Sequence, residues 1–127
     1  MVSVIYISLC ALLIVKLSWN VVKLRRAKRV SLGDGDDKEL RKAIAAQENA
    51  TEYIPTTLML LVALEYNAAP IGIVHLFGMV FVIGRLLHAI GVASHFKWRV
   101  RGMQLTYFVM LGLVIANLVY LPYEKLI

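Results

Sequence analysis

Apolar residues along this chain are grouped into four long stretches that short polar connections separate. The stretches cover about residues 2–22, 40–66, 71–95 and 104–121. Each is close to the roughly 20 residues that an α-helix needs to cross a bilayer. Because the connections are too short for a soluble domain, the pattern predicts a single all-α domain over residues 1–127. The expected fold is an integral membrane bundle of four transmembrane helices.

The second stretch carries polar residues that a lipid-facing helix would not have. Its segment AIAAQENATEYIPTTLMLL, residues 43–61, is apolar only in its second half. Charged side chains near the centre of a bilayer are costly and usually face the interior of a bundle or a cavity. Spacings of three and four residues place the polar side chains on one helical face. That face contains Arg41, Ala45, Glu48, Asn49 and Glu52.

The third stretch carries a second polar face, formed by Arg85, His88, Val92, His95 and Arg99. Glu52 and Arg85 lie at comparable depths along their helices, which predicts an ion pair between them. Two interpretations remain open. The polar side chains either only hold the helices together, or form a crevice, open to the cytoplasm, for a charged ligand. The number of polar groups beyond one ion pair favours the crevice.

Composition and charge support a membrane protein with a defined orientation. The chain is 60% hydrophobic, well above the roughly 45–50% of soluble domains, and its net charge is +6. The basic residues do not indicate a nucleic-acid partner, because most of them surround the first and third connections. The excess of Lys and Arg in cytoplasmic loops predicts that these two connections face the cytoplasm and that both termini face the outside.

Cysteine and acidic residues indicate neither a disulfide nor a metal site. Cys10 is the single cysteine, so no internal disulfide can form. The aspartates of the first connection lack the spacing of a calcium-binding loop. Instead, Asp36 with Glu39 resembles a capping box at the start of the second helix.

Four segments together resemble the MAPEG family, the membrane-associated proteins in eicosanoid and glutathione metabolism. They are RRAKRV at 25–30, AQENATEYIP at 46–55, GRLLHAIG at 84–91 and RVRGMQLT at 99–106. The chain resembles a short bacterial member, which implies an inner-membrane protein. The resemblance implies a homotrimer of four-helix subunits, with glutathione bound between neighbouring subunits in a pocket open to the cytoplasm.

The resemblance also implies which residues of the second stretch form the site. Asn49 and Glu52 match positions that bind glutathione in the family, and Gln47 and Tyr53 belong to the same motif. Ala45 stands where many animal members carry an arginine.

The other stretches contribute basic residues to the implied site. Arg25 and Arg26 match the paired arginines at the end of the first span, and Arg85 matches the arginine of the third span, with His88 on the same face. An arginine near the start of the fourth span stabilises the glutathione thiolate in family enzymes, and either Arg99 or Arg101 stands there. Val92 replaces a tyrosine that helps to bind glutathione in several members.

The chemistry of glutathione fits these residue types. Its two carboxylates need guanidinium groups, its ammonium needs a carboxylate such as Glu52, and a cation lowers the pKa of a thiol from about 8.5. The expected activity is that of a glutathione transferase or peroxidase on a lipophilic small molecule delivered by the bilayer. The alternative is a non-catalytic protein of the same fold that binds a lipid or a small anion. A small multidrug transporter fits less well, because that class depends on a glutamate in the first span, where this chain has only Lys16.

Overall fold

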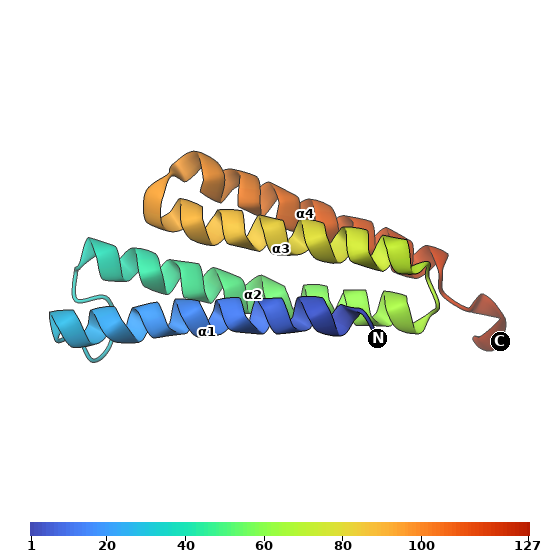
Figure 1. Ribbon diagram of the computed structural model, residues 1–127, viewed down its shortest axis with the longest axis horizontal. Coiled ribbons are helices and arrows are strands. Elements are labelled where there is room, and N and C mark those ends of the chain that lie inside the picture. Colours follow the sequence, from blue (N-terminus) through green and yellow to red (C-terminus); the bar gives the residue numbers. More distant parts are fainter.

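Four long α-helices, each antiparallel to the next, make up almost the whole chain in the computed structural model, which describes residues 1–127 (Figure 1). The helices are α1 (Ser3–Lys28), α2 (Lys38–Tyr66), α3 (Ile71–Ser94) and α4 (Phe96–Val119), followed by the short 3-10 helix η1 (Tyr123–Lys125). The predicted all-α class is confirmed. By length and composition, α1, α3 and α4 are apolar enough to cross a membrane, whereas α2 does not meet that criterion because of its polar first half.

The helix boundaries differ most from the apolar stretches at the third connection, although α1 also continues beyond the first stretch, to Lys28. The fourth apolar stretch begins near residue 104, but α4 begins at Phe96, directly after the one-residue break at His95. Three of the eight residues added, Lys97, Arg99 and Arg101, are basic and exposed, and the segment continues the helix beyond its apolar part. Hydrophobic patterning therefore located the apolar part of this helix but not its first residue.

The helices form a bundle in which α2 and α3 occupy the middle. α1 packs on α2 and α3 on one side, α4 packs on both from the other side, and α1 and α4 share no contact. The first and third connections lie together at one end of the bundle, and both termini lie at the opposite end (Figure 1). The apolar core between the helices includes Tyr6, Leu61, Val74, Phe81 and Leu113. The bundle therefore has two separate sides, one next to α1 and one next to α4.

Glycines allow α3 and α4 to approach each other backbone to backbone. A Cβ atom added at Gly102 would overlap the backbone of Gly84 and His88, and one added at Gly91 would overlap the backbone of Arg99. Gly112 instead leaves room for the ring of Phe77. Small residues at helix contacts permit this close approach in membrane bundles.

We expect Gly102→Ala to destabilise the α3–α4 pair by about 1–3 kcal/mol, because the added methyl group meets backbone atoms that cannot move aside. Gly72→Ala is the matched control, since a Cβ there meets no atom within 4 Å. Thermal unfolding in detergent, followed by circular dichroism, measures both. Equal transition temperatures for Gly102→Ala and wild type would contradict the close packing.

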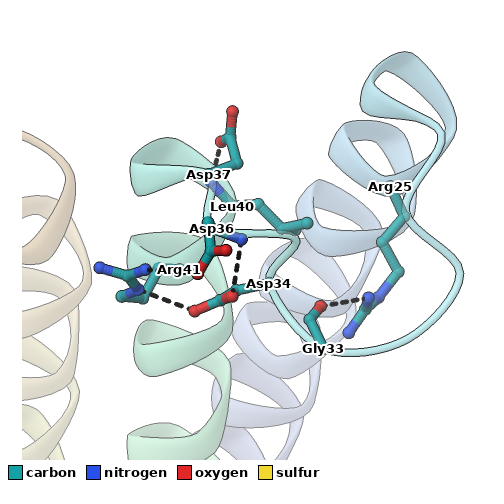
Figure 2. A network of polar contacts seen from close by, with 7 residues as sticks. All are labelled: Arg25, Gly33, Asp34, Asp36, Asp37, Leu40 and Arg41. Atoms are coloured by element: carbon teal, nitrogen blue, oxygen red, sulfur yellow. Dashed lines mark hydrogen bonds and ion pairs between the residues drawn. The ribbon is translucent and has the colours of Figure 1, made fainter.

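The start of α2 is capped by Asp37, and the prediction of a capping box at Asp36 is wrong. The Asp37 carboxylate accepts a hydrogen bond of 2.8 Å from the Leu40 N–H, and its backbone is extended, as at most N-caps (Figure 2). Asp36 instead adopts a left-handed conformation with φ of 57°, and its N–H donates to the Asp34 carboxylate at 2.9 Å. The turn that precedes the helix shifts the cap by one residue.

All four ion pairs of the chain lie in or beside this first connection. Lys28 contacts Asp37 at 2.9 Å and Glu39 at 3.1 Å, while Arg41 contacts Asp34 at 2.7 Å and Asp36 at 3.9 Å. The hydrogen bond from Arg41, followed by that from the Asp36 N–H, holds the pKa of Asp34 below its ordinary value. The Leu40 N–H and then Lys28 lower the pKa of Asp37 in the same way.

We expect Arg41→Gln to raise the pKa of Asp34 toward the ordinary value of about 3.9 and to leave that of Asp37 unchanged, since Asp37 has other partners. Because the folded pKa values are lowered, the contacts stabilise the connection above about pH 4 and are lost as the pH falls through the folded values. Carboxyl carbon-13 NMR titration of the wild type and of Arg41→Gln measures this. A parallel shift of both aspartates would contradict the assignment of partners.

The opposite end of the bundle is held by Glu65 near the end of α2. Its carboxylate accepts hydrogen bonds from the N–H groups of Val2, at 2.5 Å, and Ser3, at 2.8 Å. No side chain of α1 caps its own first turn, so Glu65 satisfies these donors from a neighbouring helix. Nearby, the Tyr6 hydroxyl lies 2.6 Å from His75 Nδ1, which ties α1 to α3.

Candidate functional site

Arg85 lies in the middle of the bundle, on α3, and its side chain is almost fully buried, with a relative exposure of 1%. Its Nη2 donates to the Asn49 side-chain oxygen at 2.6 Å, and its Nη1 donates to the Thr106 hydroxyl at 3.4 Å. His88 Nδ1 is 3.5 Å from Nη2. The Nε–H has no partner within the chain. The guanidinium therefore connects α2, α3 and α4 through neutral groups.

Two tyrosines complete this arrangement. The Tyr53 and Tyr107 hydroxyls are 2.9 Å apart, and the rings meet edge to face. The Arg85 guanidinium carbon lies 5.9 Å from the centre of the Tyr53 ring, within the range of a cation–π contact. We call these residues the Arg85 cluster: Asn49, Tyr53, Arg85, His88, Thr106 and Tyr107. The cluster spans the α2–α3–α4 side of the bundle.

The predicted ion pair between Glu52 and Arg85 is wrong. Glu52 is exposed and forms no ion pair, and the partner of Arg85 on α2 is Asn49. Three residues advance a helix by about 300°, so Glu52 points about 60° away from Asn49 around the axis. A polar helical face inferred from residue spacing alone could not show which of these two residues meets Arg85. As a result, the buried guanidinium has no carboxylate partner in its own chain.

Three of the predicted site residues lie on the other side of the bundle: two of them belong to α1, and the third faces it. The Gln47 amide donates to the Ser18 hydroxyl of α1 at 3.0 Å. Arg25 donates from Nη1 to the Gly33 carbonyl at 2.7 Å, which fastens the first connection to α1 (Figure 2). The Arg26 guanidinium carbon lies 5.8 Å from the centre of the Trp19 ring. Within one chain, these residues are separate from the Arg85 cluster.

The two arginines proposed for thiolate stabilisation lie in the first turns of α4 and are exposed. The Arg99 guanidinium carbon is 5.0 Å from the centre of the Phe96 ring. Arg101 lines a shallow hollow of about 460 Å³ together with Lys97 and Gln104. Neither arginine forms an ion pair in the chain, so both are free to meet an anionic group.

The structure adds two residues that the sequence did not single out. Thr106 accepts from Arg85 and donates to the Gly102 carbonyl at 2.9 Å, and Tyr107 meets Tyr53. No periodic polar face on α4 marks them. The close approach of α3 and α4 at Gly84 and Gly102 is what brings this part of α4 to the cluster. No group of three or more side chains suited to holding a metal ion is present.

Taken together, the apolar helices and the buried polar cluster define an all-helical membrane protein with a polar site inside its bundle. Residues 3–119 match the family model of the MAPEG family, and the chain belongs to that family. It is 45% identical over 125 residues to the inner membrane protein YecN of Escherichia coli strain K12, an alignment that covers 98% of this chain and 95% of that protein. The YecN protein of Escherichia coli O6:H1 matches to the same extent. The predicted family is confirmed.

We expect Asn49→Leu to destabilise the protein by about 1–3 kcal/mol or more, because it leaves the buried Arg85 guanidinium without its shortest hydrogen bond. Arg85→Met should cost less in the Asn49→Leu background than in the wild type, since the unsatisfied charge is then removed. A double-mutant cycle of unfolding free energies measures this coupling. Additive effects would show that the two side chains do not interact.

Proposed function

We propose that this protein binds glutathione and uses it as a thiol substrate in transferase or peroxidase chemistry on lipophilic electrophiles. The observation that carries the proposal is the buried Arg85, which has no carboxylate partner and holds Asn49 in place. Family membership supports it, because the MAPEG family includes glutathione transferases. The residues around Asn49 match the family motif that binds glutathione.

The electrostatics of the Arg85 cluster favour an anionic ligand. An unpaired charge inside a membrane bundle is costly, and a nearby anion lowers that cost. Glutathione supplies two carboxylates and, after deprotonation, a thiolate. Glu48 and Glu52 are exposed on the adjoining face of α2 and form no ion pair, so either can receive the ammonium group. The site thus offers both signs of charge that this tripeptide requires.

The division of site residues between the two sides of the bundle supports a site between subunits of a homotrimer. Gln47 and Asn49 are two positions apart, which corresponds to about 200° around α2. Gln47 faces α1, while Asn49 faces α3 and α4. Because α1 and α4 do not touch within the chain, one ligand can meet both groups only if a second copy supplies one of them.

The proposed reaction needs a cation at the thiol. Arg99 or Arg101 stabilises the thiolate, and the thiol proton passes to solvent. In conjugation, the sulfur forms a bond to an electrophilic carbon, and the leaving group departs with its electron pair. The bilayer supplies the apolar partner from the side, which brings the two reactants together.

We also propose an orientation for the four helices in the membrane. All four helices cross the bilayer, and α2, at 29 residues, is about 44 Å long, so that its polar first turns extend beyond the hydrocarbon layer of about 30 Å. The basic first and third connections face the cytoplasm, and both termini face outward. The name of the relative YecN supports the bacterial inner membrane as the location.

A second candidate function is non-catalytic binding of a lipid or small anion. Ala45 and Val92 provide the observation that favours it, because neither can make the polar contacts of the arginine and tyrosine found in many animal members. Val92 lines a cavity formed by α1, α2 and α3. Glutathione binding without turnover would select this candidate.

We expect Arg99→Ala or Arg101→Ala, whichever arginine meets the thiol, to lower glutathione conjugation of a generic electrophile by about 100-fold or more, as the loss of one charge-stabilising group does at other sites. Arg29→Ala is the matched control, because Arg29 is exposed at the same end of the bundle. Thiolate absorbance in the protein complex and turnover are both measured. Wild-type values in both single variants and the double variant would overturn the mechanism.

We expect two inactive variants to restore binding when they are mixed. Glu52→Ala damages the α2 surface beyond Asn49, and Arg26→Ala damages the α1 surface. If the site lies between subunits, random assembly of both variants into trimers leaves about a quarter of the sites intact. Glutathione titration after co-refolding or co-expression measures this recovery. No recovery, with trimers confirmed by mass measurement, would place the site within one subunit.

A further inference from the structure

A cavity at the basic end of the bundle lies apart from the Arg85 cluster. It has a volume of about 520 Å³, is partly open to the outside, and is formed by α1, α2 and α3. None of the residues predicted to bind glutathione lines it. Its size lies within the range of about 300–1,000 Å³ that is typical of ligand pockets. The cavity therefore has the dimensions of a separate binding site.

The charges around the cavity are mainly positive. Lys23 of α1 and Lys42 of α2 both line it, both are exposed, and neither forms an ion pair. The single acidic residue of the wall, Glu39, is already paired with Lys28 at 3.1 Å. Two ammonium groups without carboxylate partners at one cavity favour an anionic ligand.

Apart from Asn20, the rest of the wall is apolar, and part of it lies deeper in the bundle than the lysines. Leu17 lies six residues before Lys23 on α1, which corresponds to about 9 Å along the helix, and Ala46 lies about one turn beyond Lys42 on α2. Both residues therefore lie closer to the middle of the bundle than the lysines do. Small residues such as Ala89 of α3 leave the space open. The cavity thus has a basic end near the membrane surface and an apolar end at hydrocarbon depth.

We infer that this cavity binds an anionic phospholipid of the surrounding membrane. Lys23 and Lys42 contact the phosphate, and the glycerol and the upper part of the acyl chains lie against Leu17 and Ala46. Basic pockets between transmembrane helices bind lipid head groups in this way. A free phosphate compound would use the lysines but not the apolar end, so both halves of the cavity favour a lipid. The inference does not depend on glutathione binding.

Native mass spectrometry of the protein in a non-ionic detergent tests this inference. Phosphatidylglycerol should bind as one tight lipid per chain, and phosphatidylcholine with the same acyl chains should bind far more weakly. Glycerol phosphate should also bind weakly, since it lacks the acyl chains. Lys23→Gln/Lys42→Gln should weaken phosphatidylglycerol binding by roughly 30-fold, because each lysine near a membrane surface contributes about a factor of five.

Two further variants separate the cavity from general surface charge. Lys38→Gln/Lys97→Gln removes the same charge from the same end of the bundle without touching the cavity, and it should bind the lipid almost as tightly as the wild type. Ala43→Leu fills part of the cavity without changing the charge. It should weaken the binding of phosphatidylglycerol although both lysines are still present.

Several outcomes would overturn the inference. Equal losses in the two lysine double variants would indicate diffuse attraction to a basic surface. Equal binding of phosphatidylcholine would mean that the charge of the head group is not recognised, and equal binding of glycerol phosphate would mean that the acyl chains are not used. No effect of Ala43→Leu would mean that the lipid does not occupy the cavity. If glutathione displaces the lipid and Lys23→Gln/Lys42→Gln also loses glutathione, the cavity is a thiol-substrate site. Lipid binding that persists when glutathione does not bind would leave this inference intact and contradict only the proposed function.

Discussion

A positive charge buried among apolar helices, with only neutral partners, is the constraint on which the rest of this structure depends. The Arg85 guanidinium is 1% exposed and is held by Asn49 on α2 and Thr106 on α4. Each partner must come within hydrogen-bonding distance, because an unsatisfied buried charge would cost several kcal/mol. The close α3–α4 contact at Gly84 and Gly102 meets this requirement, since a larger residue at Gly102 would push Thr106 away. The glycines and the polar cluster are thus parts of one arrangement.

The same constraint gives α2 two different sides. Its inward polar residues satisfy Arg85 toward α3 and α4, and Gln47 satisfies Ser18 toward α1. The positions between them, including Glu48 and Glu52, are exposed although α2 is one of the two central helices. Carboxylates on a membrane-protein helix need water, a ligand or another protein surface. In the homotrimer proposed above, a second copy would cover these polar surfaces.

The fold could be predicted largely from the sequence, whereas the site could be predicted only in part. Long apolar stretches and short connections identify four helices because lipid-facing and core positions must both be apolar. The polar faces correctly indicated that α2 and α3 meet around Arg85. Spacing could not decide whether Asn49 or Glu52 meets the guanidinium, because they differ by about 60° around the helix. Thr106 gave no signal, because its role comes from the packing of α4. The cap at Asp37 depends on the left-handed backbone of Asp36, which the pattern of apolar and polar residues does not predict.

The distribution of ion pairs explains where the molecule retains positive charge. The aspartates of the first connection and Glu39 neutralise Lys28 and Arg41. Lys42, next to Arg41, and Lys23, five residues before Lys28, are left without carboxylate partners, as are Arg99 and Arg101 on α4. Local pairing therefore makes the connection nearly neutral, while both sides of the bundle stay basic. These free cations lie at the end of the helices, whereas Arg85 is buried in the middle of the bundle. The exposed cations are therefore available to an anionic group at the end of the bundle, whereas the Arg85 guanidinium is held inside it by Asn49 and Thr106.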